Sequence, residues 1–217
     1  MATLLYIEAS PRGDKSLSSR VAGAFLEAYR EANPADRVDH LHLFRDTLPG
    51  FGAEGAGQKM AQIASLTSTG KGIAAEGEWR GVLREIERLK AADRVLISAP
   101  MWNYSIPYPL KHYIDLICQP GLTFYVDRQG QYVGMVKGKP LQLILASGSE
   151  YEMRFPREDD GTTTDFQRAY LEHIGRFIGF EDIHCIKVQP GAGAPKAVEA
   201  MLAEKVAEAR VAARGFY

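Results

Sequence analysis

Three serines lie in a short polar segment where hydroxyl groups could bind an anion. Ser10, Ser16 and Ser18 follow an apolar run at residues 4–7 and lead into a helical pattern, within the segment SPRGDKSLSS. A phosphate needs several short hydrogen bonds, which hydroxyls and the unpaired amides of a helix N-terminus supply, and the helix dipole adds attraction. Ordinary capping of the helix would need only one of these serines. The cluster therefore predicts a phosphate-binding loop.

This serine segment matches neither of two common nucleotide-binding motifs. A Walker P-loop needs a glycine-rich loop ending in Gly-Lys-Ser or Gly-Lys-Thr, and a dinucleotide fold needs G-x-G-x-x-G at this place. The run Gly191-Ala192-Gly193 is too short and too late in the chain to count. The predicted phosphate loop is a hydroxyl cradle rather than a glycine-rich one.

A second loop carries large flat side chains. Residues 94–99 form an apolar run too short for a helix, which predicts a strand buried on both faces. The run ends at Pro100, and a helical pattern begins near Leu110. Between them stand Met101, Trp102, Asn103 and Tyr104. Because ligands of open α/β sheets sit beyond the carboxyl ends of the strands, this loop is a candidate ligand wall, although its aromatic residues could equally cap the sheet edge.

A third loop follows the apolar run at residues 141–145. It comprises Ala146, Ser147, Gly148, Ser149, Glu150 and Tyr151. A glycine such as Gly148 lets a backbone come close to a flat ring. When the strands before the three loops are neighbours in one sheet, the loops outline a single site. A phosphate held by the serines and a flat ring between the other two loops have the shape of flavin mononucleotide (FMN).

Alternating strands and helices must position these loops. Apolar runs predict strands at residues 4–7, 38–43, 94–99, 141–145 and 183–188. Helical patterns separate them, and this alternation is typical of parallel sheets. The fold class predicted is α/β: a flavodoxin-like, doubly wound, five-stranded parallel sheet of order 2-1-3-4-5 with helices on both faces. We expect a single domain spanning residues 1–217.

Two segments stand outside this alternation. Short β-like runs at residues 122–126 and 131–136 flank a turn at 127–130, which predicts an inserted β-hairpin. Between Arg45 and Gly77 no strong period is present, so no regular element is predicted there.

Composition narrows the possible partners. The formal net charge of 217 residues is −1, with 24% charged residues of both signs mixed along the chain, so neither a nucleic-acid surface nor a membrane patch is predicted. Cys118 and Cys185 have no paired spacing, and His40 and His42 lack a further ligand nearby, so neither a disulfide nor a metal site is expected. A start without signal-peptide features and a lack of membrane-length apolar stretches predict a cytoplasmic protein that acts on small molecules.

The residues of the second loop also resemble a known family, the FMN-dependent NADH-azoreductases, which are also quinone reductases. The resemblance is most specific in APMWNYSIP at residues 99–107 and in GLTF at 121–124, and it includes the serine loop. It runs along nearly the whole chain. Trp102 stands where tyrosine is common, and Ser147 and Ser149 replace an arginine and a glycine that are frequent in the family.

Carried over position by position, the resemblance implies a role for each loop. The implied FMN phosphate loop comprises Ser10, Ser16, Leu17 and Ser18. The implied contacts with the isoalloxazine ring are Met101, Trp102, Asn103 and Tyr104, and those at its pyrimidine side are Ala146, Ser147, Gly148 and Ser149. Phe124 and Tyr151 would line the substrate slot, while a position in the hairpin core is the alternative for Phe124.

The implied activity is the two-electron reduction of quinones and azo compounds by NADH or NADPH, with FMN bound tightly but noncovalently. No set of nucleophile, base and orienting residue is evident, so the flavin is expected to carry the chemistry and no side chain is expected to be catalytic. Because no second nucleotide motif occurs, we expect donor and acceptor to use one slot in turn, a ping-pong mechanism.

The alternative function is a flavodoxin-like electron carrier that has no small-molecule acceptor of its own. The nearly neutral charge and the bulky loop at residues 101–104 favour an enzyme with a substrate slot. The resemblance further implies a homodimer whose active site is completed across a two-fold interface, and closed two-fold dimers are the commonest oligomers.

Overall fold

A five-stranded parallel sheet forms the centre of the protein. The computed structural model describes residues 1–151 and 165–216. The strands of the sheet are β1 (Thr3–Glu8), β2 (Arg37–His42), β3 (Arg94–Pro100), β6 (Leu141–Ala146) and β7 (Ile183–Val188). Their order is β2-β1-β3-β6-β7, and every neighbouring pair is parallel. The predicted order 2-1-3-4-5 is confirmed.

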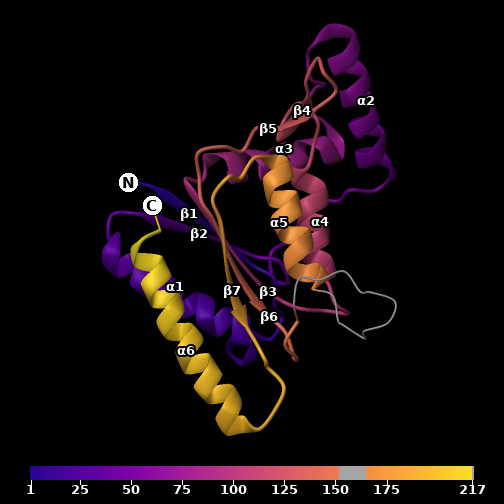
Figure 1. The fold of residues 1–217 in the computed structure, drawn as a ribbon. Coiled ribbons are helices and arrows are strands. Elements are labelled where there is room, and N and C mark those ends of the chain that lie inside the picture. The colour runs from indigo at the N-terminus through magenta and orange to yellow at the C-terminus, as the bar shows by residue number, and fades with distance from the viewer. Residues whose placement is uncertain (152–164, 217) are drawn as a thin grey trace.

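Helices cover both faces of this sheet, as predicted (Figure 1). One face carries α1 (Leu17–Ala32) and α6 (Pro195–Arg214), which lie side by side. The other carries α3 (Gly77–Ala91), α4 (Tyr108–Ile117) and α5 (Phe166–Ile178). Since successive side chains of a strand point to opposite faces, β1 contributes to two cores. Leu5 and Ile7 pack with α3, α4 and α5, whereas Leu4 and Tyr6 pack with α1 and α6.

The predicted hairpin is also present, formed by β4 (Phe124–Val126) and β5 (Tyr132–Gly134). It presses against the end of α5, where a side chain on Gly134 would meet the backbone nitrogen of Gly179 at 2.3 Å. Val136 N donates to Ile178 O at 2.8 Å just beyond this contact. Because backbone meets backbone here, the hairpin is fixed at the amino-terminal side of the sheet, where α5 ends.

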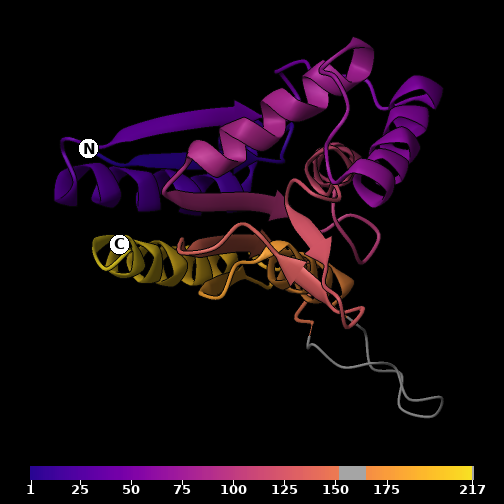
Figure 2. The same ribbon diagram turned by 90° about the horizontal axis from the view of Figure 1, so that it is seen from above.

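The sequence assigned no element between Arg45 and Gly77, but the structure has one there. Residues Ala53–Thr69 form a helix of 17 residues, α2, which lies outside the layers, beside α3 and the hairpin (Figure 2). Only Gly55 and Gln62 are buried along it, so the apolar period that marks a packed helix is absent. The helix is held by polar contacts instead.

The main polar anchor of α2 is a carboxylate from the next helix. Glu78 Oε2 accepts hydrogen bonds from Gly52 N at 2.9 Å and Gly55 N at 2.6 Å. These amides belong to the first turn of α2, which has no side-chain cap of its own. The negative charge of Glu78 also interacts favourably with the positive, N-terminal end of the helix dipole. Further along, Gln62 accepts from Ile73 N at 2.9 Å and donates to Pro120 O at 3.4 Å.

We therefore expect Glu78→Ala to loosen α2 locally. Loss of this one acceptor oxygen should cost about 1–2 kcal/mol of the local opening free energy, because two helix-end amides lose their partner. Hydrogen exchange should become faster across residues 53–69. The control is Glu87→Ala, also on α3. The Glu87 side chain is 70% exposed and lies 3.9 Å from that of Lys90. Equal exchange in the two variants would contradict the anchoring role.

Candidate functional site

The loops after β1, β3 and β6 meet at the carboxyl edge of the sheet, as the strand order requires. Glu8 pairs with Ser98, and Pro100 pairs with Ala146. Past these pairs the loops remain bonded, since Ala9 N donates to Ser98 O at 2.9 Å and Met101 N to Ala146 O at 2.6 Å. The three groups of residues predicted to surround FMN therefore start from one edge.

The serine loop has more hydroxyl groups than helix capping needs. Ser16 caps α1 by accepting from Ser19 N at 3.3 Å, and its Oγ lies 3.1 Å from Ser18 Oγ. Ser10, Ser16 and Ser18 are all buried. Leu17 and Ser18 open the helix, where backbone amides have no partner within the helix. The hydroxyls of Ser16 and Ser18 thus lie beside free backbone amides at the start of α1, which suits an anion.

A carboxylate network anchors the strand just before the serine loop. Glu8 accepts from Ser19 Oγ at 2.6 Å and lies 3.0 Å from His40 Nε2. Burial by itself would raise the pKa of Glu8, but the hydrogen bonds with His40 and Ser19 outweigh it and lower that pKa. His42, on the same strand as His40, is buried, and its Nδ1 accepts from Phe44 N at 3.2 Å. These contacts fix the ends of β1 and β2.

The loop after β3 is a tight turn in an unusual conformation. Trp102 and Ser105 exchange two backbone hydrogen bonds, each 2.9 Å long. Between them, Asn103 has φ 49° and Tyr104 has φ 68°, the left-handed region that residues other than glycine rarely adopt. Positive φ at both central positions is the geometry of a type I′ turn. Strained backbone of this kind clusters at ligand sites, where the surroundings enforce it.

Aromatic residues from other segments extend the wall that this turn begins. The ring of Phe44, which follows β2, lies 5.6 Å from that of Trp102 and 5.9 Å from that of Tyr108, between centroids. An open cleft of about 550 Å³ lies beside them. It is lined by Phe51, Trp102, Asn103, Ile106, Tyr108, Lys111, His112 and Asp115. Lys111 forms an ion pair with Asp115 at 2.6 Å on the exposed face of α4.

The sequence did not identify Phe44, Phe51 or Tyr108 as part of the site. Phe44 directly follows a strand at the same edge of the sheet. This position could have marked it as a candidate site residue from the sequence. Phe51 and Tyr108 lie in segments whose path could be known only from the fold.

The loop after β6 runs close to the loop after β3. Ser147, predicted at the pyrimidine side of the flavin, is buried, whereas Gly148 and Ser149 are exposed. The ring of Tyr151 meets that of Tyr104 edge to face, with centroids 5.8 Å apart. The second and third loops thus touch across the edge of the sheet.

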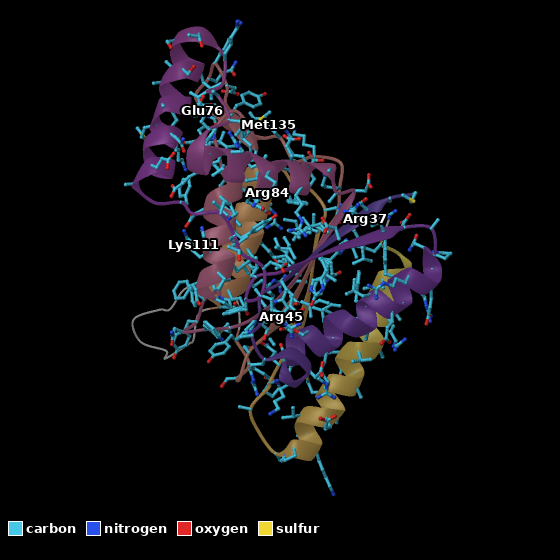
Figure 3. The ribbon with its side chains drawn as sticks, turned by 180° about the vertical axis from the view of Figure 1, so that it is seen from behind. Arg37, Arg45, Glu76, Arg84, Lys111 and Met135 are labelled. Carbon is cyan, nitrogen blue, oxygen red and sulfur yellow. The ribbon has the colours of Figure 1, made fainter. Side chains whose placement is uncertain are left out.

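Phe124 is the predicted site residue that this chain does not bring to its own loops. Its ring packs 4.6 Å from that of Phe177, near the end of α5, at the amino-terminal side of the sheet. Met135, just after the hairpin, likewise lies well apart from Arg45, which follows β2 (Figure 3). Within this chain, Phe124 is half-buried and packs against Tyr132 of the hairpin and Phe177 of α5.

Neither cysteine has the character of a nucleophile. Burial raises the pKa of both Cys118 and Cys185 to about 12, so the thiolate is disfavoured at neutral pH. Within residues 1–151 and 165–216, no group of three or more His, Cys, Asp or Glu side chains is arranged to hold a metal ion. Helices long and apolar enough to cross a membrane are likewise lacking in these ranges.

Comparison with known proteins shows the family to which the chain belongs. A family model described as flavodoxin-like fold matches residues 2–212. An FMN-dependent NADH:quinone oxidoreductase of Nitratidesulfovibrio vulgaris is 46% identical over 211 residues, which cover 97% of each chain. One from Desulfotalea psychrophila is 41% identical over 218 residues, covering 100% of this chain and 99% of the relative.

Solved structures agree with these sequence relatives. An azoreductase from Bacillus anthracis strain Sterne superposes with a TM-score of 0.82 at 25% identity, with full coverage of both chains. An FMN-dependent NADH-azoreductase from B. anthracis strain Ames Ancestor, in complex with FMN, gives a TM-score of 0.77 at 27% identity and 98% coverage of each chain. The chain belongs to the flavodoxin-like family and, within it, to the FMN-dependent NADH:quinone oxidoreductases and azoreductases.

Proposed function

We propose that this protein is an FMN-dependent oxidoreductase that uses NADH or NADPH to reduce quinones and azo compounds by two electrons. The observation that carries the proposal is the convergence of the serine loop, the strained aromatic turn and the loop after β6 at one edge of the sheet. Relatives that align over nearly the whole chain are named for this activity.

The chemistry of the serine loop fits a phosphate monoester. Ser10, Ser16 and Ser18 offer hydroxyl donors, and the amides of Leu17 and Ser18 lie at the positive end of α1. These groups would bind a doubly charged phosphate, and the same segment carries two cationic residues, Arg12 and Lys15. We assign the FMN phosphate to these four residues.

The flavin ring would then lie against the other two loops. Met101, Trp102, Asn103 and Tyr104 would contact one part of it, and Ala146, Ser147, Gly148 and Ser149 its pyrimidine side. Bound FMN would supply the redox chemistry, accepting a hydride from the nicotinamide and passing two electrons to the acceptor. The protein would bind and orient the flavin and its substrate. Backbone amides of these loops would act as fixed hydrogen-bond donors near the negative charge that develops on the reduced flavin.

The geometry favours an enzyme over a simple electron carrier. A carrier needs only an exposed flavin edge, whereas this chain has an aromatic cleft of about 550 Å³ beside the predicted ring site. Such clefts are typical of small-molecule sites. We propose that the nicotinamide and the acceptor occupy one slot in turn, because the sequence offers no second nucleotide motif.

We further propose that the protein is a cytoplasmic homodimer in which the partner subunit's Phe124 lines the slot. Within one subunit, Phe124 lies at the end of the sheet away from the loops, so it reaches substrate only from another copy. The hairpin region also exposes several large apolar side chains, an unfavourable arrangement for a free surface. They are Tyr125, Val126, Tyr132 and Met135. Tyr151 would line the slot from the subunit that holds the flavin.

Removing two hydroxyls from the serine loop should weaken FMN binding. For Ser10→Ala combined with Ser18→Ala we expect at least about a 150-fold rise in the Kd for FMN, since two hydrogen bonds to a charged group contribute roughly 1.5–3 kcal/mol each, or about 3 kcal/mol together at the least. Flavin fluorescence quenching measures this with apoprotein. The control is Ser68→Ala on the exposed side of α2. Unchanged affinity in the double variant would show that phosphate binds elsewhere.

Initial-rate kinetics test the shared slot. With NADH and a benzoquinone as varied substrates, we expect parallel lines in double-reciprocal plots, because the first product must leave before the second substrate enters. Intersecting lines would mean that both substrates are bound together, and the proposal of one slot would then be abandoned while the assignment of FMN stood.

Sedimentation velocity tests the dimer. We expect a dimer at micromolar concentration, and we expect Val126→Asp to shift it toward monomer, because a charge would enter an apolar interface. The matched control is Val211→Asp on α6, where the side chain is 70% exposed. A wild-type monomer, or a dimer dissociated only by the α6 variant, would exclude a hairpin interface.

A further inference from the structure

The loop after β6 is held on its outer side by the segment that follows β7. Gly191 N donates to Ser147 O and Ala192 N to Gly148 O, both at 2.8 Å. These two bonds continue the pairing of β6 with β7 past the end of the strands. They fix the first half of the loop by backbone alone.

The second half of this loop is held by side chains, above all by Gln189. Gln189 Oε1 lies 3.0 Å from Ser147 Oγ and accepts from Tyr151 N at 3.4 Å. Ser147 Oγ also lies 2.8 Å from Ser149 O, so its single proton serves two acceptors. One amide oxygen therefore connects the beginning of the loop to its end.

Lys187, two residues earlier, supports the same end of the loop. Its ammonium group donates to Tyr151 O and forms an ion pair with Asp165 at 3.1 Å. Asp165 is buried and caps α5 by accepting from Arg168 N at 2.8 Å. Removing Lys187 would leave a buried carboxylate uncompensated, so a variant at that position would mix loop effects with loss of stability. Gln189 is half-buried and uncharged, and is the cleaner position to test.

We propose that Gln189 is a positioning residue for FMN binding: through Ser147 and Tyr151 it fixes the loop that meets the pyrimidine side of the flavin. This inference rests on the proposed function. Gln189 acts through the loop rather than by contact with substrate, so it is not a catalytic residue. Its contribution is one hydrogen-bond acceptor, the side-chain amide oxygen, which lies between the donors Ser147 Oγ and Tyr151 N.

Two substitutions separate the acceptor from the bulk of the side chain. Gln189→Leu removes the oxygen at similar size, and Gln189→Glu keeps an oxygen that accepts from both donors. We expect Gln189→Leu to bind FMN about tenfold more weakly, as the loss of roughly one hydrogen bond implies, and to shift the visible absorption band of the bound flavin. Gln189→Glu should restore both the affinity and the band position. Glu204→Leu, at an exposed position of α6, is the control.

A double-mutant cycle tests the route of the effect. If Gln189 acts through Ser147, the Kd of Ser147→Ala combined with Gln189→Leu should rise less than the product of the two single effects. Hydrogen exchange of FMN-free protein gives a second readout, since Gln189→Leu should speed exchange at Ser149, Glu150 and Tyr151 while the core strands remain protected.

The outcomes distinguish this inference from the proposed function. Wild-type protein that binds no FMN would overturn both. Wild-type protein that binds FMN, with Gln189→Leu equal to it in affinity, band position and loop exchange, would overturn the positioning role alone. Failure of Gln189→Glu to restore affinity and band position would also overturn it, because the acceptor oxygen would then not be the cause.

Discussion

The register of three buried parallel strands determines everything that follows at the site. β1, β3 and β6 are apolar on both faces, with Leu5 and Ile7 in one core and Leu4 and Tyr6 in the other. A slip of one residue would exchange these two sets, so packing holds the register firmly. The loops that follow these strands take their relative positions from the cores. The site is therefore positioned by side chains that never touch a ligand.

The sequence allowed the strands and the hairpin to be predicted because their apolar runs are easy to recognise. The order of the strands followed from their alternation with helices, which is typical of one fold class. Helix α2 was missed for a physical reason: it buries little, and Glu78 holds its first turn by hydrogen bonds. Apolar periodicity detects elements that pack by the hydrophobic effect. An element held by polar contacts from a distant residue leaves almost no local trace in the sequence.

The candidate site shows the same division. The loops at residues 10–18, 101–104 and 146–149 could be predicted because each directly follows a readable strand. Phe44 and Tyr108 join the aromatic wall through the path of other loops, and Gln189 reaches the loop after β6 across 42 residues of sequence. Phe124 raises a different problem. It lies at the far end of the sheet, so the substrate-lining role proposed for it would depend on how two copies associate, which one chain's pattern of strands and helices does not determine.

The turn at Asn103 and Tyr104 has a consequence for anyone who would engineer this protein. Glycine would relieve positive φ at position 104, a gain on the order of 1 kcal/mol in folding free energy. The same change would remove the ring that meets Tyr151 and would free the loop to sample other shapes. If variants of position 104 were selected for a high melting temperature, the selection would therefore favour glycine, which leaves the loop after β3 less ordered. At this turn, heat resistance and fitness for catalysis are opposing selection criteria.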